Sequence, residues 1–187
     1  MSGATISPNF NHQKTKAIEH FQHITTFVLD VDGVLTDGNL WLLPGGIQAR
    51  KMNIRDGYAL QLAIKKGYRI YILSGAVSEE SRDRLMRLGI TDIQMGIKDK
   101  TGALSAYMLQ HSLTPANILY MGDDLPDLSA MRLVGTPCCP ADAAAEIKQC
   151  SVYISPFNGG AGCVRDVVEK VLKLRNDWEE DVTVASI

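Results

Sequence analysis

The chain has 187 residues, of which 45% are hydrophobic and 21% are charged, and its formal net charge is −2. This length suits one domain with its own core, and nothing in the sequence suggests the basic stripe that nucleic-acid-binding proteins usually show. No apolar run reaches the roughly 18 residues that a membrane span requires, and the polar stretch 1–13 lacks the apolar segment of a secretory signal. We therefore expect a cytoplasmic protein with a flexible lead (1–13), one domain (14–175) and a C-terminal tail (176–187).

Strand-like and helix-like segments alternate along the chain, bounded by glycine, proline or capping residues. The predicted strands are 25–29, 68–73, 90–95, 118–121, 134–138 and 152–154. The predicted helices are 14–22, 56–66, 78–88, 100–111, 128–133, 141–149 and 164–174. Segments 39–43 and 47–53 flank Pro44-Gly45-Gly46, which predicts a β-hairpin that projects above the sheet as a flap. The alternation favours an α/β class: a three-layer, doubly wound (Rossmann-like), mostly parallel sheet.

The first strand runs directly into Asp30 and Asp32, two carboxylates with no cation near them in sequence. Its uninterrupted apolar run is typical of a strand buried on both faces of a parallel sheet. Open α/β sheets bind their ligands beyond the carboxyl ends of such strands. Because unpaired buried charge is costly, we expect this pair to share a metal ion or a proton.

Polar residues also follow later strands: Ser74, the group Asp123/Asp124/Asp127, and a lysine (Lys98 or Lys100). Converging carboxylates favour a hard cation such as Mg²⁺, and a hydroxyl and an ammonium suit phosphate oxygens. This combination predicts phosphoryl transfer, in which one carboxylate attacks phosphorus and the other transfers the proton. Asp30 as nucleophile and Asp32 as acid and base fit this scheme, although spacing alone leaves the two roles interchangeable.

The stretch Asp30-Val31-Asp32-Gly33-Val34-Leu35-Thr36-Asp37 resembles the DxDGxxTD signature of haloacid-dehalogenase-type phosphatases. Later segments match the family's second, third and fourth motifs in order: Ser74, Lys100 and Gly122-Asp123-Asp124-x-x-Asp127. Only a hairpin and one helix fit between Asp37 and Ser74, so there is no cap domain. The chain is thus similar to the capless group that contains 3-deoxy-D-manno-octulosonate 8-phosphate phosphatase. Further matches are Asn53-Ile54-Arg55-Asp56-Gly57, Gln94-x-Gly96-x-x-x-Lys100 and Gly159-Gly160-x-Gly162-x-Val164-Arg165.

The resemblance implies a phosphoric monoester hydrolase of lipopolysaccharide biosynthesis that removes the terminal phosphate of a 2-keto-3-deoxy sugar acid. It implies a homotetramer in which a neighbouring subunit closes each active site. It also implies Mg²⁺ bound by Asp30, Asp123 and the backbone carbonyl of Asp32. The implied catalytic residues are Asp30, Asp32, Ser74 and Lys100. The implied substrate-binding residues are Asp32, Asn53, Ile54, Arg55, Asp56, Gly57, Arg84, Lys100 and Asp124.

Two positions depart from the family, because Ala76 and Gln61 stand where arginines are usual. Guanidinium groups suit the carboxylate of a sugar acid, so their loss favours, as an alternative, a nonulosonate (sialic acid-type) 9-phosphate as substrate. Three cations are candidates to compensate: Lys65, Lys66 and Arg82.

Structural roles are the alternative for several residues. Asp127 could cap a helix, Ser74 could serve a turn, and Arg55 and Asp56 could pair at a helix start. Gly159–Gly162 could be a flexible loop, or it could face a phosphate or a subunit. The apolar flap around Trp41 suits a subunit contact. A non-catalytic oligomerisation module, related to sugar-acid cytidylyltransferases, is the alternative from a different functional class.

Overall fold

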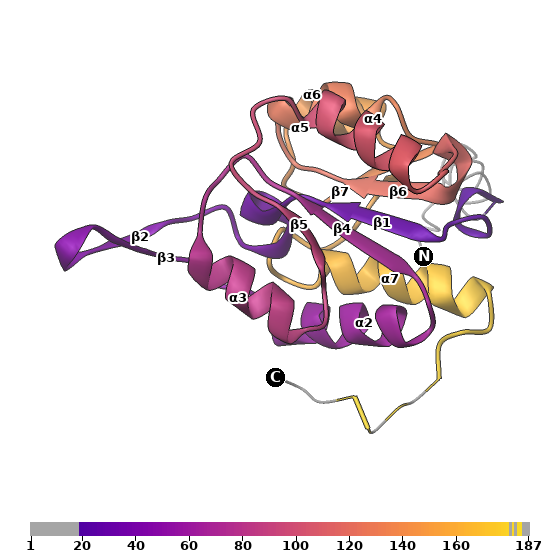
Figure 1. Cartoon of the computed structure of the whole chain (residues 1–187), viewed down its shortest axis with the longest axis horizontal. Coiled ribbons are helices and arrows are strands. Elements are labelled where there is room, and N and C mark those ends of the chain that lie inside the picture. Colours follow the sequence, from indigo (N-terminus) through magenta and orange to yellow (C-terminus); the bar gives the residue numbers. More distant parts are fainter. Residues whose placement is uncertain (1–18, 180, 182, 185–187) are drawn as a thin grey trace, which may run out of the picture.

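The computed structural model describes residues 19–179, 181, 183 and 184. Its centre is a six-stranded sheet in which every neighbouring pair of strands is parallel (Figure 1). Across the sheet the strands are β5 (Asp92–Gln94), β4 (Arg69–Leu73), β1 (Thr26–Leu29), β6 (Ile118–Met121), β7 (Thr136–Cys139) and β8 (Tyr153–Ile154). The chain leaves β1 toward β4 on one side and β6 toward β8 on the other. This order confirms the predicted doubly wound architecture.

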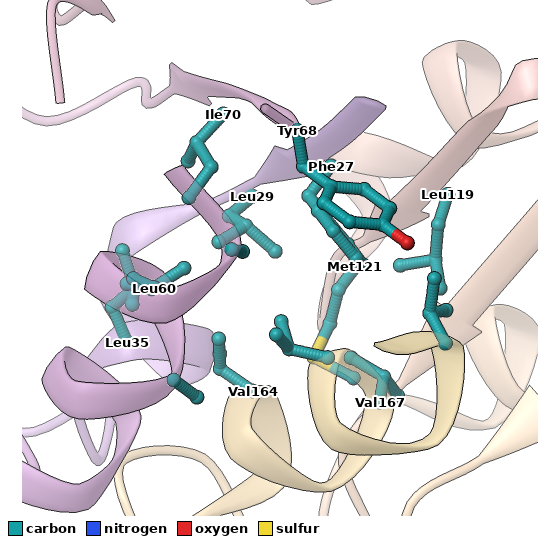
Figure 2. Packing of buried hydrophobic residues seen from close by; sticks show 14 of the residues in the cluster. Phe27, Leu29, Leu35, Leu60, Tyr68, Ile70, Leu119, Met121, Val164 and Val167 are labelled. Atoms are coloured by element: carbon teal, nitrogen blue, oxygen red, sulfur yellow. The ribbon is translucent and has the colours of Figure 1, made fainter. Parts of the chain in front are cut away.

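Helices cover both faces of the sheet and give three layers (Figure 1). One face carries α2 (Ile54–Lys65), α3 (Glu79–Arg87) and α7 (Cys163–Leu174), and the other carries α4 (Lys100–Gln110), α5 (Leu125–Met131) and α6 (Ala145–Cys150). The central strand β1 is buried along its whole length. Its Phe27 and Leu29 pack toward α2 and α7 (Figure 2), whereas Val28 belongs to the core on the opposite face. This two-sided burial explains the apolar run in the sequence.

The predicted flap is a hairpin of β2 (Trp41–Leu43) and β3 (Ile47–Ala49), joined by the turn η2 (Pro44–Gly46). It extends away from the body of the molecule (Figure 1). Trp41 is 63% exposed and Leu42 is 76% exposed. Between Asp37 and Ile54, a stretch that the structure describes throughout, the hairpin is the only element, so the prediction of a capless domain is confirmed.

Two helices begin earlier than predicted, one because of a capping side chain and one because of a proline. Helix α2 begins at Ile54 because the Asn53 side chain accepts a hydrogen bond from the Arg55 N–H. Helix α5 begins at Leu125, three residues earlier than predicted, because proline is favoured in a first helical turn. The predicted helix 14–22 lies largely outside the described residues, as does the lead 1–13. The four cysteines, Cys138, Cys139, Cys150 and Cys163, are free. Within the described residues, no helix is long and apolar enough to cross a membrane.

The described part of the tail folds back onto the domain. Asp177 accepts a 2.7 Å hydrogen bond from the hydroxyl of Tyr68. Glu179 pairs with Lys66 at 2.8 Å, and Asp181 pairs with Lys65 at 2.5 Å. The acidic tail therefore engages two of the three cations that the sequence offered as substitutes for the missing arginines.

Candidate active site

Asp30 directly follows β1, where its backbone N–H bonds the carbonyl of Met121 on β6. The Nζ of Lys100, at the first position of α4, lies 2.9 Å from Asp30 Oδ1 and 2.7 Å from Asp127 Oδ1. All three side chains are at most 9% exposed. Lys100, rather than the exposed Lys98, is thus the lysine that reaches the strand ends.

Burial and the neighbouring charges shift the pKa values of the ionisable groups in this cluster. Burial, followed by the neighbouring Asp127, raises the pKa of Asp30 to about 7 against the favourable effect of Lys100. Burial and the adjacent carboxylates likewise raise the pKa of Asp123 to about 7. Burial alone would lower the pKa of Lys100, but Asp30 and Asp127 outweigh it and raise that pKa. One buried ammonium therefore does not neutralise three carboxylates, and the site favours a second cation.

The geometry of the carboxylates fits such a cation. Asp30, Asp123 and Asp127 each offer an oxygen, and the three oxygens lie within 4.8 Å of one another. The backbone makes room for them at Gly33, whose φ is +89° and where a Cβ would stand 2.0 Å from Asp123 Oδ2. An all-oxygen donor set of this kind suits Mg²⁺.

The sequence analysis grouped Asp127 with the strand-end carboxylates, but it did not include Asp127 among the site residues and weighed a helix cap as its alternative role. Its Oδ1 accepts hydrogen bonds from Lys100 and, at 2.7 Å, from the hydroxyl of Tyr120 on β6. It is buried within the cluster, so it serves the site rather than only the start of α5. Its membership in the motif Gly122-Asp123-Asp124-x-x-Asp127 was the available signal.

The Asp32 side chain is not one of the three clustered carboxylates, and it bonds Arg50, a residue that the sequence analysis did not identify. Arg50 Nε and Nη2 donate to the two carboxylate oxygens of Asp32 at 2.7 and 3.1 Å. The Thr36 hydroxyl lies 3.4 Å from Asp32 Oδ1. Arg50 lies between the flap and α2, so it connects the base of the flap to the aspartate loop.

The residues that follow Arg50 strengthen this connection. Lys51 pairs with Asp37 at 2.8 Å, and Met52 forms an antiparallel bridge with Thr36. Three consecutive residues at the flap base therefore hold the loop that carries Asp32.

Ser74 lies at the end of β4, next to β1, as its motif predicts. It is buried, and its Oγ accepts a hydrogen bond from the Ala76 N–H. Its backbone carbonyl accepts from the Ile97 N–H, which ties this loop to the one leading to Lys100. Its assignment as a phosphate-binding hydroxyl stays a prediction.

The predicted substrate-binding segment 53–57 divides between two environments. Ile54 and Arg55 are exposed, whereas Asp56 and Gly57 are buried. Asp56 Oδ1 accepts a 2.7 Å hydrogen bond from the Arg165 N–H at the start of α7, and Asp56 does not pair with Arg55. Asp56 therefore joins α2 to α7. The pocket roles of the segment and of the exposed Asp124, which precedes α5, stay predictions.

Replacing Asp56 by asparagine is expected to change how stability depends on pH. Burial raises the pKa of Asp56 to about 6 from its ordinary 3.8, so its stabilising contribution is complete below pH 4 and is lost as pH rises through 6. Between these values Asp56→Asn should gain about 1.4 kcal/mol per pH unit relative to the wild type. Urea unfolding from pH 4 to 8 measures this difference. The exposed Asp83→Asn is the control, and a difference that does not vary with pH would contradict the interpretation.

A cleft of about 480 Å³ lies between the flap base and α3. Its lining includes Arg50, Met52 and Ile54 on one side and Ser78, Ser81 and Arg84 on the other. The guanidinium of Arg84 also lies over Gly57, where a Cβ would come within 3.2 Å of Nη2. Of the predicted substrate-binding residues, Ile54, Gly57 and Arg84 thus lie in or beside one cleft.

Comparisons with known proteins agree with this site. The phosphatase KdsC of Escherichia coli K12, named for 3-deoxy-D-manno-octulosonate 8-phosphate, is 31% identical over 179 residues, covering 96% of this chain and 95% of the relative. The chain belongs to this phosphatase family. The fold of this chain matches that of the 3-deoxy-D-manno-octulosonate (KDO) 8-phosphate phosphatase from Moraxella catarrhalis, crystallised with magnesium, phosphate and KDO (TM-score 0.84, 32% identity). The match covers 87% of this chain and 94% of that structure. A putative haloacid-dehalogenase (HAD) hydrolase from Legionella pneumophila has a TM-score of 0.87 at 29% identity, with 91% and 93% coverage. No general family model matches the chain.

Membership in the KDO 8-phosphate phosphatase family confirms the resemblance drawn from the four motifs. It makes the chain a phosphoric monoester hydrolase of the capless HAD type. The relatives have nearly the same length as this chain, so the match extends over the whole domain.

Proposed function

We propose that this protein is a Mg²⁺-dependent phosphatase that hydrolyses the terminal phosphate ester of 3-deoxy-D-manno-octulosonate 8-phosphate. The supporting observation is the buried cluster of Asp30, Asp123 and Asp127 around Lys100 at the strand ends. Asp30 and Asp123 would hold the ion, together with the backbone carbonyl of Asp32. When bound, Mg²⁺ supplies positive charge that screens the nucleophile from the phosphate and stabilises the transferring group.

In this proposal Asp30 acts as the nucleophile. Its carboxylate oxygen forms a bond to phosphorus while the bond between phosphorus and the sugar oxygen breaks, which gives an aspartyl-phosphate. Asp32 donates a proton to the departing sugar oxygen. Water then attacks phosphorus, its proton passes to Asp32, and Asp30 is released with inorganic phosphate. Lys100 holds Asp30 Oδ1 throughout and favours its ionised, nucleophilic form.

Phosphate release from 3-deoxy-D-manno-octulosonate 8-phosphate is expected in the presence of Mg²⁺ and should be abolished by EDTA. Readdition of Mg²⁺ should restore it, because the carboxylate cluster otherwise lacks its balancing charge. A colorimetric phosphate assay on the purified protein measures this. Absence of release from sugar-acid phosphates of eight or nine carbons would refute the proposal.

A nonulosonate 9-phosphate remains the second candidate substrate, because Ala76 and Gln61 remove two expected guanidinium groups. The ratio of kcat/KM for the two substrates distinguishes them. The alternative of a non-catalytic oligomerisation module has less support. Burying three carboxylates around a lysine costs desolvation free energy, and oligomerisation alone does not require such a cluster.

We also propose that the flap forms part of a homotetramer interface in which a neighbouring subunit closes each active site. Trp41, Leu42 and Ile47 are each more than half exposed, and an apolar strip of this kind is typical of an interface. Leu42→Asp should therefore produce smaller species by light scattering. Leu109→Asp, at an 84% exposed leucine on α4, is the matched control, and equal behaviour of the two variants would contradict the interface.

A further inference from the structure

The missing guanidinium groups raise the question of what neutralises the carboxylate of a sugar-acid substrate. The three cations considered from sequence are engaged elsewhere: Lys65 and Lys66 pair with tail carboxylates. Arg82 lies 3.8 Å from Glu79 and donates to the carbonyl of Ile93. None of the three lines the cleft beside Asp32. A different pair of residues must therefore supply the positive charge.

Arg50 and Arg84 are the two cations that line this cleft. The side chain of Arg50 is only 6% exposed, and its guanidinium stands directly beside Asp32, the residue assigned to the departing sugar oxygen. Arg50 connects this cleft, which it lines, with Asp32, two residues along the chain from the proposed phosphate site at Asp30.

Arg84 supplies the second guanidinium, from α3. It is half-buried, and within the part of the chain that the structure describes its side chain has no hydrogen bond or ion pair. Among the cleft residues, Glu80 is the one carboxylate, and it accepts a hydrogen bond from Ser78. Because this guanidinium is bound to no protein acceptor in the described residues, its donors remain available to an anion in the cleft. Its volume of about 480 Å³ lies within the ~300–1,000 Å³ typical of small-molecule sites.

We propose that Arg50 and Arg84 form the binding site for the carboxylate of a phosphorylated sugar acid. Arg50 exchanges the Asp32 carboxylate for that of the substrate, a replacement of one bidentate carboxylate pair by another. The exchange also frees Asp32 to face the departing sugar oxygen. This inference rests on the proposed function, and it makes Arg50 a specificity-determining residue that takes over from the arginines absent at positions 61 and 76.

Binding of two product ligands tests the proposal without requiring turnover. Calorimetry with the Mg²⁺-loaded protein would measure 3-deoxy-D-manno-octulosonate, which carries the carboxylate, and inorganic phosphate, which does not. Arg50→Met and Arg84→Met should each weaken sugar-acid binding by about 10- to 100-fold, the range of a lost charge-assisted contact, and phosphate binding by less than about 3-fold. Arg82→Met, on the same helix as Arg84, should leave both affinities unchanged. Arg50→Lys should give an intermediate loss, because it retains the charge without the bidentate geometry.

Equal weakening of both ligands in Arg50→Met would overturn the proposal, because Arg50 would then serve the phosphate or Asp32 alone. Unchanged sugar-acid binding in either methionine variant would overturn it as well. In steady-state assays of the sugar-acid phosphate, KM should rise by a larger factor than kcat falls. A wild-type protein that binds the sugar acid but releases no phosphate would refute the proposed function and leave the binding site standing.

Discussion

Replacing Asp30 by asparagine is expected to lower kcat for phosphate release by at least about 1,000-fold, since it removes the covalent nucleophile. The amide is nearly the same size as the carboxyl group and can still bond Lys100 through its oxygen. The fold should therefore persist, and the loss should appear in kcat. An assay of phosphate release, with circular dichroism to verify folding, measures both quantities.

Covalent trapping makes this prediction specific to Asp30. After acid quenching of a reaction with ³²P-labelled substrate, the wild-type protein should retain label and Asp30→Asn should retain none. Asp99→Asn is the matched control, because Asp99 caps α4 next to Lys100 and asparagine can also cap a helix. Activity of Asp30→Asn within tenfold of the wild type would exclude Asp30 as the nucleophile.

The residues at the centre of the site could be predicted from sequence, because they follow strands that are recognisable as apolar runs. Asp30 and Asp123 each follow a buried apolar run, and a parallel sheet brings such ends to one edge. Strands β1 and β6 are neighbours in register, with Leu29 opposite Met121. Lys100 was found through its motif, but the choice between it and Lys98 depended on where α4 begins. The structure decides this by burying Lys100 against Asp30.

The periphery of the site depends on contacts that no local pattern encodes. Arg50 lies 18 residues from Asp32 in a stretch predicted as a strand of the flap. For Asp56, by contrast, the local sequence does indicate its position, in the first turn of a helix. Its partner, the Arg165 N–H, lies 109 residues away. The partner of Arg50 is set by how the flap base returns to the aspartate loop, and the partner of Asp56 is set by how α7 packs on α2.

Replacing Lys100 by methionine is expected to destabilise the metal-free protein by about 3–5 kcal/mol at pH 7.5, the cost of removing one partner from a buried ion pair. Methionine fills a similar volume, so the loss reflects charge: Asp30 and Asp127 would lose their shared ammonium. Lys98→Met, at an exposed neighbouring lysine, should change stability little. Phosphate release should also fall by orders of magnitude, since Asp30 would ionise less readily.

The dependence of stability on pH and on Mg²⁺ distinguishes the loss of the Lys100 charge from a loss of packing. The pKa of Asp30, already raised to about 7, should rise further in Lys100→Met. A raised carboxyl pKa means that stability is retained at low pH and lost as pH increases through that pKa. The destabilisation should therefore shrink toward pH 5, where Asp30 and Asp123 are protonated in the folded protein, and Mg²⁺ should offset part of it at pH 7.5 by binding the folded state. Urea unfolding at both pH values, with EDTA or Mg²⁺, measures these differences. A loss of equal size under all these conditions would show that Lys100 acts through packing, and that the carboxylates do not depend on it for their charge balance.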